Sequence, residues 1–229
     1  MKRENLNISA YLVVGRENTN GRRVSKIAAD AVRAGFTCVQ IRSKIATARE
    51  LMEDCRETAD EIKKLGKENA VALLVDDRLD VVLACRERKI KVDGIHVGQS
   101  DIPADICRKL LGENAIVGLS AKTDDLIEYA KTADTCGIDY FGAGPLHPTP
   151  TKADCGLSAS GKIITRSLEE ISILSKTSKI PVVLGGGVKL SDIADLKKTG
   201  IAGFFVVSAV AGAENPFEEA KKLVDAWNF

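Results

Sequence analysis

The sequence predicts an α/β protein, a single (β/α)₈ TIM barrel over residues 1–229. The chain has 229 residues, of which 45% are hydrophobic, so it is long enough to bury one barrel core. Short, nearly continuous apolar segments recur along it, as expected of parallel strands buried on both faces. Segments with helical spacing separate them. This alternation indicates repeated βαβ units, and it favours a closed barrel over an open sheet.

The strands are expected where β-branched and aromatic residues cluster. These segments are 10–14, 36–41, 71–75, 93–97, 115–120, 138–144, 180–186 and 203–208. Apolar stripes define the two clearest helices: Val24, Ile27, Ala28 and Ala31 in one, and Leu51, Cys55, Ala59 and Ile62 in the other. The first ends before Gly35, and the second follows a capping box at Thr47 and Glu50. The segment from Pro216 onwards is expected to form the closing helix.

Composition excludes several classes of function. The 33 basic and 32 acidic residues leave a net charge of +1, and there is no basic block to neutralise a nucleic acid backbone. No apolar run reaches the roughly 18 residues that a membrane span needs. The six cysteines have no CxxC spacing, so we expect reduced thiols and a cytoplasmic location.

Polar residues follow most of the predicted strands, at the end of a (β/α)₈ barrel where active sites lie. In QIRSK, alternation places Gln40, Arg42 and Lys44 on one face of an extended segment. That arrangement suits a multiply charged anion such as diphosphate. The alternative is a solvated strand end.

Two aspartates, Asp77 and Asp101, follow the third strand and the fourth strand. Side chains from adjacent strand ends could share a hard cation, and Mg²⁺ typically takes one or two carboxylates plus water and phosphate oxygens. The alternative is that each aspartate caps the helix that follows it.

The segment from Pro145 to about Gly161 contains three prolines and cannot be helical throughout. A long loop in a compact domain is usually functional. Thr149 and Thr151 offer hydroxyls there, and Lys152 offers a cation.

Glycines 185–187 and Ser208 follow the last two strands, where such barrels often bind phosphate through backbone N–H groups. A tight turn is the alternative explanation for the glycines. Of the two histidines, His96 is expected to be a hydrogen-bonded core residue. His147 lies in the loop without a partner at triad or metal spacing, so covalent catalysis has no support.

Seven segments resemble, in order and in position, the sequences of thiamine-phosphate synthases. They are VQIRSK, VDDRLDVVLA, DGIHVGQSD, VGLSAKT, DYFGAGPLHPTPTK, PVVLGGGV and VVSAV. The resemblance covers residues 10–210, and HPTPTK combined with QIRSK and GIHVGQSD is a specific signature.

The resemblance implies two substrate subsites and a metal site. The pyrimidine diphosphate would contact Gln40, Ile41, Arg42, Ser43, Lys44, Asp76, Ser120 and Lys152. The thiazole phosphate would contact Thr149, Pro150, Thr151, Gly187, Val207 and Ser208. Asp77 and Asp101 would bind Mg²⁺, and the catalytic residues Arg42, Lys44, Ser120 and Lys152 would stabilise the departing diphosphate.

The implied reaction is Mg²⁺-dependent transfer of the hydroxymethylpyrimidine group from its diphosphate to thiazole phosphate, carboxylated or not. It releases diphosphate and gives thiamine phosphate. Binding both small molecules in one cavity would supply proximity, and a homo-oligomer is compatible with the sequence. Two alternatives remain open: a thiazole tautomerase-like isomerase that binds only the thiazole phosphate, and a non-catalytic barrel that binds thiamine phosphate.

Three positions depart from the family pattern. Asp76 stands where the family usually has Asn. SAKT replaces a SVHT-like sequence and is expected to bring Lys122 near the diphosphate. LGGGV replaces AIGGI after the seventh strand and is interpreted as a packing variant.

Overall fold

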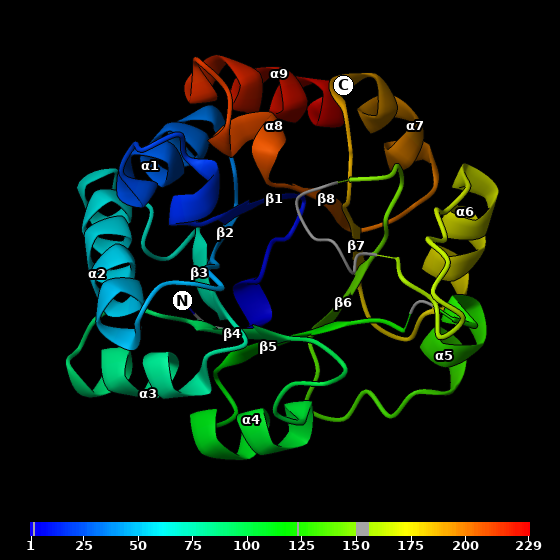
Figure 1. Ribbon diagram of the computed structural model, residues 1–229, viewed down its shortest axis with the longest axis horizontal. Coiled ribbons are helices and arrows are strands. Elements are labelled where there is room, and N and C mark those ends of the chain that lie inside the picture. Colours follow the sequence, from blue (N-terminus) through cyan, green and yellow to red (C-terminus); the bar gives the residue numbers. More distant parts are fainter. Residues whose placement is uncertain (2, 123, 150–155) are drawn as a thin grey trace.

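The computed structural model describes residues 1, 3–122, 124–149 and 156–229. Within these ranges, eight parallel strands close into a barrel in chain order, and helices surround it (Figure 1). The predicted (β/α)₈ fold is therefore confirmed. The strands are β1 (Ala10–Val14), β2 (Cys38–Ile41), β3 (Ala72–Asp76), β4 (Gly94–Val97), β5 (Ile116–Ser120), β6 (Tyr140–Ala143), β7 (Val182–Leu184) and β8 (Gly203–Val206).

The helices begin and end largely where the sequence signals lie. They are α1 (Val24–Ala34), α2 (Ala48–Lys64), α3 (Leu79–Glu87), α4 (Ala104–Leu111), α5 (Leu126–Thr132), α6 (Leu168–Thr177), α7 (Ile193–Lys198), α8 (Ser208–Ala211) and α9 (Pro216–Asn228). Gly35 ends α1 at φ 113°, a conformation that side chains with a Cβ rarely adopt. The predicted capping box is present at the start of α2: Glu50 N donates to Thr47 Oγ1, and Thr47 N donates to a Glu50 carboxylate oxygen.

Strand alternation divides the apolar side chains into two clusters. One lies inside the barrel and includes Tyr11, Cys38, Leu74 and Tyr140. The other, larger cluster lies between the strands and the helices. Because successive side chains of a strand point to opposite faces, the inner cluster takes alternate residues of the strands that contribute to it.

Two glycines that alternation turns toward the barrel axis, Gly118 of β5 and Gly142 of β6, change what the barrel can hold. A Cβ atom at Gly118 would lie 2.3 Å from the Tyr140 ring, and one at Gly142 would lie 3.1 Å from the His96 ring. The large side chains of His96 from β4 and Tyr140 from β6 therefore occupy the volume that side chains at these positions would fill. The two glycines thus make room inside the barrel for the His96 and Tyr140 rings.

No helix within the described ranges combines the length and the apolarity needed to cross a bilayer.

We expect Thr47→Ala to lower the free energy of unfolding by about 1 kcal/mol, because α2 loses a side-chain acceptor at its N-terminus. In thermal denaturation this corresponds to a decrease in Tm of about 2–4 °C. Thr177→Ala is the control, because that hydroxyl only donates to the Ile173 carbonyl within α6. Equal effects of the two substitutions would contradict the role assigned to the capping box.

Candidate active site

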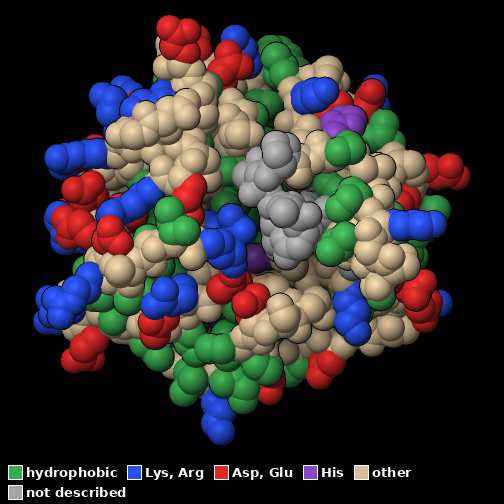
Figure 2. All heavy atoms as spheres, in the orientation of Figure 1, with side chains coloured by type: hydrophobic (Ala, Val, Ile, Leu, Met, Phe, Trp, Pro, Cys, Tyr) green, Lys and Arg blue, Asp and Glu red, His purple; other side chains and the backbone are tan. Residues whose placement is uncertain are grey.

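A cavity of ≈ 190 Å³ opens at the C-terminal ends of the strands. Figure 2 shows the corresponding hollow, bordered by basic and acidic side chains. Its lining comes from most of the strands and from the loops that follow them. This is the end of the barrel at which the sequence places the polar strand-end residues.

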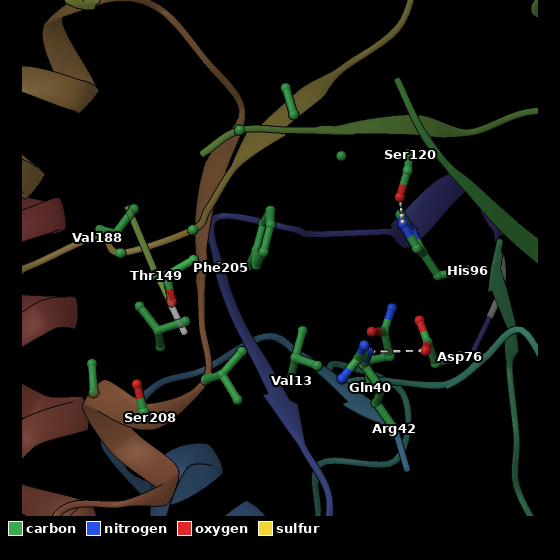
Figure 3. A pocket seen from close by; sticks show the side chains of 18 of the residues that line it. Val13, Gln40, Arg42, Asp76, His96, Ser120, Thr149, Val188, Phe205 and Ser208 are labelled. Atoms are coloured by element: carbon green, nitrogen blue, oxygen red, sulfur yellow. Dashed lines mark hydrogen bonds and ion pairs between the residues drawn. The ribbon is translucent and has the colours of Figure 1, made fainter. Parts of the chain in front are cut away.

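The cavity has two chemically different sides. Figure 3 shows Gln40, Arg42, Asp76, His96 and Ser120 together on one side. On the opposite side lie Thr149, Val188 and Ser208, with Val13 and Phe205 between the two groups. The arrangement provides a charged region and a hydroxyl-bearing region separated by apolar side chains.

The charged side is built at the ends of β2 and β3. Arg42 Nε lies 3.1 Å from Asp76 Oδ2, and Lys44 Nζ lies 3.6 Å from the same oxygen. Lys44 also donates a hydrogen bond to Asp77. The residues that follow β2 thus bring two cations to one group of carboxylates.

The backbone fixes both aspartates that were expected to bind a metal. Asp77 has φ 57°, and its N–H donates to the His96 carbonyl at 2.8 Å, which ties the end of β3 to β4. Asp101 accepts a hydrogen bond from Gly98 N at 2.8 Å. The capping alternative is wrong for both, because Arg78 precedes α3, Pro103 precedes α4, and neither helix start has a side-chain cap.

The three neighbouring acids have shifted pKa values. Burial raises the pKa of Asp76 to about 7. The charge of Asp77 also raises this pKa, whereas the charges of Arg42 and Lys44 lower it. Burial would also raise the pKa of Asp77, but the hydrogen bond and charge of Lys44 hold it below its usual value. Burial raises the pKa of Asp101, opposed by the Gly98 N–H and assisted by Asp77.

The donor set fits a hard divalent cation. Asp77 and Asp101 interact through their carboxyl groups, so two oxygen ligands converge from adjacent strand ends. In the described part of the chain, no three or more His, Cys, Asp or Glu side chains gather as a complete metal site. Mg²⁺ does not need such a cage, because water and substrate phosphate oxygens usually complete its coordination.

On the opposite side, the β6 loop is fastened to the loop after β7. Leu146 N and His147 N donate to the Gly186 carbonyl at 3.0 and 3.1 Å. Gly187 has φ 74°, and a Cβ atom there would lie 2.8 Å from the His147 carbonyl oxygen. The glycines therefore form a tight turn, and the same turn lines the cavity beside Thr149, Val207 and Ser208.

Comparisons with known proteins identify the family. The model of the thiamine monophosphate synthase family matches residues 10–210. The chain belongs to this family. It is 34% identical over 228 residues to a thiamine-phosphate synthase of Clostridium tetani, with 100% of each chain covered. It is 38% identical to that of Syntrophomonas wolfei, over 97% of this chain and 98% of the relative.

A solved structure gives the same result. A thiamine phosphate pyrophosphorylase from Pyrococcus furiosus superposes with a TM-score of 0.78 and 28% identity, covering 99% of this chain and 97% of that one. The family resemblance, and the transferase function of thiamine-phosphate synthesis that it implies, are thereby confirmed.

Several residues expected at the site do not line the cavity with their side chains, and these include the ion-paired Lys44 and Asp77 and the neighbouring Asp101. Ile41 is fully buried in the cluster between strands and helices. The Ser43 hydroxyl donates to Glu17 at 2.8 Å. Lys122 does not line the cavity; its ammonium lies 5.4 Å from the centre of the Tyr129 ring. The expectations for Pro150, Thr151 and Lys152 fall outside the described residues.

Sequence reasoning did not single out three aromatic residues that shape the site. Phe205 lines the cavity, and Tyr11 and Tyr140 lie beneath it. The period of two within β8 would have turned Phe205 inward. A tyrosine in a buried strand needs a hydrogen-bond partner, which could have pointed to a polar network.

We expect Asp76→Asn to stabilise the metal-free protein at pH 8. The pKa of this carboxyl is about 7 in the fold, against a reference value of 3.8, so its ionisation opposes folding above pH 7. This destabilisation becomes smaller as the pH falls toward 4, because the Asp76 carboxyl is then protonated in the folded state. In EDTA, the substitution should raise Tm at pH 8 by about 2 °C or more, and by less at pH 5.

Asp80→Asn is the control for this measurement, because Arg78 lowers the pKa of that exposed carboxyl, so its loss brings no stabilisation at pH 8. If Asp76→Asn did not raise Tm at pH 8, or raised it equally at pH 8 and pH 5, the result would contradict the burial of an unfavourable charge.

Proposed function

We propose that the chain transfers the hydroxymethylpyrimidine group from its diphosphate to thiazole phosphate, carboxylated or not, in a Mg²⁺-dependent reaction. The observation that supports this most directly is the two-sided cavity. Arg42 and Asp76 line one side, next to the ion pairs that join Lys44 to Asp76 and Asp77, and hydroxyls with a glycine turn line the other side. Both proposed substrates are small molecules, and the proposed location is the cytoplasm.

The charged side is proposed to bind the pyrimidine diphosphate. Arg42 and Lys44 supply positive charge, and Ser120 and Lys152 supply further donors to the diphosphate. Gln40 and Asp76 lie beside Arg42 and are proposed to contact the pyrimidine. For Ile41 and Ser43, any contact falls to the backbone, since their side chains are engaged elsewhere.

The opposite side is proposed to bind the thiazole phosphate. Thr149 and Ser208 bring hydroxyls to this region, and Gly187 and Val207 bring backbone to the cavity surface. Pro150 and Thr151 complete the proposed set. The absence of a Cβ at Gly187 lets an anion approach the backbone closely.

Asp77 and Asp101 are proposed to hold the Mg²⁺, which when bound would neutralise negative charge on the diphosphate. Arg42 and Lys44 act on the same anion from β2. In the free protein, Lys44 is held by Asp77 and Asp76, so it is already positioned at the diphosphate side. Such preorganised charge stabilises a leaving group without rearrangement during the reaction.

The reaction breaks the bond between the pyrimidine methylene carbon and the diphosphate oxygen, whose electron pair departs with the diphosphate. The thiazole nitrogen then forms the new bond to carbon with its own lone pair. In the carboxylated substrate, CO₂ is also lost. Val13 and Phe205 lie between the two sides, so apolar side chains surround the place where the cationic carbon would form, and they limit access of water.

The two alternatives use less of this cavity. An isomerase that binds only thiazole phosphate has no use for the charged side, whereas a thiamine phosphate sensor needs no turnover. The synthase is distinguished from both alternatives by incubating the protein with both substrates and Mg²⁺ and measuring thiamine phosphate and diphosphate. Absence of both products from folded protein would overturn the proposal.

We expect Asp77→Asn to reduce kcat/KM by about 100-fold or more, because one carboxylate proposed to hold Mg²⁺ becomes neutral. The loss should be partly recovered at high Mg²⁺ concentration. Asp105→Asn, on the exposed side of α4, is the matched control and should leave kcat/KM within about twofold. An unchanged rate for Asp77→Asn would remove this residue from the metal site.

A further inference from the structure

A chain of hydrogen bonds crosses the barrel beneath the cavity. Gln40 Nε2 donates to the Tyr11 hydroxyl at 2.7 Å, and the hydroxyls of Tyr11 and Tyr140 are 2.8 Å apart. The Tyr140 hydroxyl lies 3.0 Å from His96 Nδ1, and His96 Nε2 lies 3.0 Å from Ser120 Oγ. Five side chains from five strands are therefore joined, and both ends of the chain line the cavity.

The interior of the barrel makes room for this chain. A Cβ atom at Gly118 would lie 2.5 Å from His96 Nδ1 and 2.4 Å from the Tyr140 hydroxyl. On the other side, a Cβ at Gly142 would lie 3.4 Å from His96 Nε2. The imidazole ring is thus held beside two positions that lack side chains, with its two nitrogens directed at different partners.

Burial keeps the tyrosines neutral. It raises the pKa of Tyr11 and of Tyr140 well above the usual value, and each also acts on the other. A neutral tyrosine has one proton to donate. Because the Tyr11 hydroxyl accepts a hydrogen bond from the Gln40 amide, its own hydrogen is available for the hydrogen bond with Tyr140.

With Tyr11 as the donor to Tyr140, each later hydrogen bond takes one direction. Tyr140, having accepted from Tyr11, donates to His96 Nδ1. His96 Nδ1 is then the acceptor nitrogen, so in the neutral ring the proton is on Nε2, which donates to Ser120. Ser120 accepts at its oxygen and retains its own proton for a group in the cavity. At the other end, the Gln40 amide oxygen is left as an acceptor.

We propose that His96 is a positioning residue that, as the Nε2–H tautomer, commits the Ser120 hydroxyl to donate into the cavity. This inference rests on the proposed function, in which Ser120 faces a diphosphate. A polyanion can accept a hydrogen bond but cannot donate one once ionised, so Ser120 must turn its proton toward it. The Gln40 oxygen correspondingly accepts from the exocyclic amino group of the pyrimidine.

The opposite direction would present the wrong groups. If His96 carried its proton on Nδ1, Ser120 would donate to Nε2 and offer lone pairs to the diphosphate. Gln40 would then offer N–H groups to the amino group of the pyrimidine. A single tautomer therefore sets the hydrogen-bonding character of two residues on separate strands.

The tautomer can be measured without any assay of activity. The chain has 2 histidines, so ¹⁵N-histidine labelling of the His147→Gln variant leaves the signals of His96 alone. We expect ¹⁵N chemical shifts of a protonated Nε2 and an unprotonated Nδ1. Protonation on Nδ1, or an equal mixture of tautomers, would overturn the proposal.

The second measurement separates positioning from general stability. In His96→Met, the KM for the pyrimidine diphosphate should rise about ten- to hundredfold, as expected for a lost hydrogen bond to a charged group. The KM for thiazole phosphate should stay within about twofold. His96→Gln restores an N–H donor and should recover part of the loss. Equal increases for both substrates would indicate a merely structural role and overturn the proposal.

Tyr140→Phe removes the hydroxyl in the middle of the hydrogen-bond network and so tests that network. It should shift His96 toward a mixture of tautomers and raise the KM for the pyrimidine diphosphate alone. Tyr129→Phe is the matched control, because that hydroxyl accepts from Gln99 at 3.0 Å and Gln99 reaches Ser120 only at the backbone carbonyl, not at the hydroxyl. Calorimetric binding of the pyrimidine diphosphate replaces KM if the wild-type protein forms no product. The absence of product would overturn the proposed function, while the tautomer and binding measurements would still decide the role of His96.

Discussion

Closure of the parallel sheet between β8 and β1 is the constraint on which the site depends. Leu12 pairs with Val206 across this seam, as Leu12 pairs with Val39 on the other side. Once the sheet is closed, alternation turns every second side chain toward a shared interior, and the strand ends form one rim. Residues far apart in the chain, such as Gln40 and Ser208, therefore line the same cavity.

The charged rim is stabilised unevenly. Burial, with a smaller contribution from the charge of Asp77, raises the pKa of Asp76 and of Asp101, and Arg42 and Lys44 offset only part of this effect at Asp76. An arrangement that is unfavourable in the free protein becomes favourable when a cation joins it. Perturbed pKa values of this kind are typical of functional sites, where local stability is given up for binding.

Two further sets of hydrogen bonds hold the strand ends around the cavity in place. Polar side chains inside the barrel connect β1, β2, β4, β5 and β6 through hydrogen bonds, while backbone bonds hold the β6 loop against Gly186. A fully hydrogen-bonded polar network in a low-dielectric interior is rigid, because an unpaired member would be costly. The two sides of the cavity are thus kept in place by different parts of the backbone.

The sequence by itself determined the barrel, its strand positions and the polar strand ends, because periodicity and caps act over a few neighbouring residues. Glu50 and Gly35 confirm this at the ends of helices. Only the tertiary structure decided that Asp77 caps no helix, because its N–H is bonded to the His96 carbonyl of the neighbouring strand. It also joined His96 to Tyr140, 44 residues away in the chain. Such contacts depend on barrel closure and inward glycines, which no local pattern encodes.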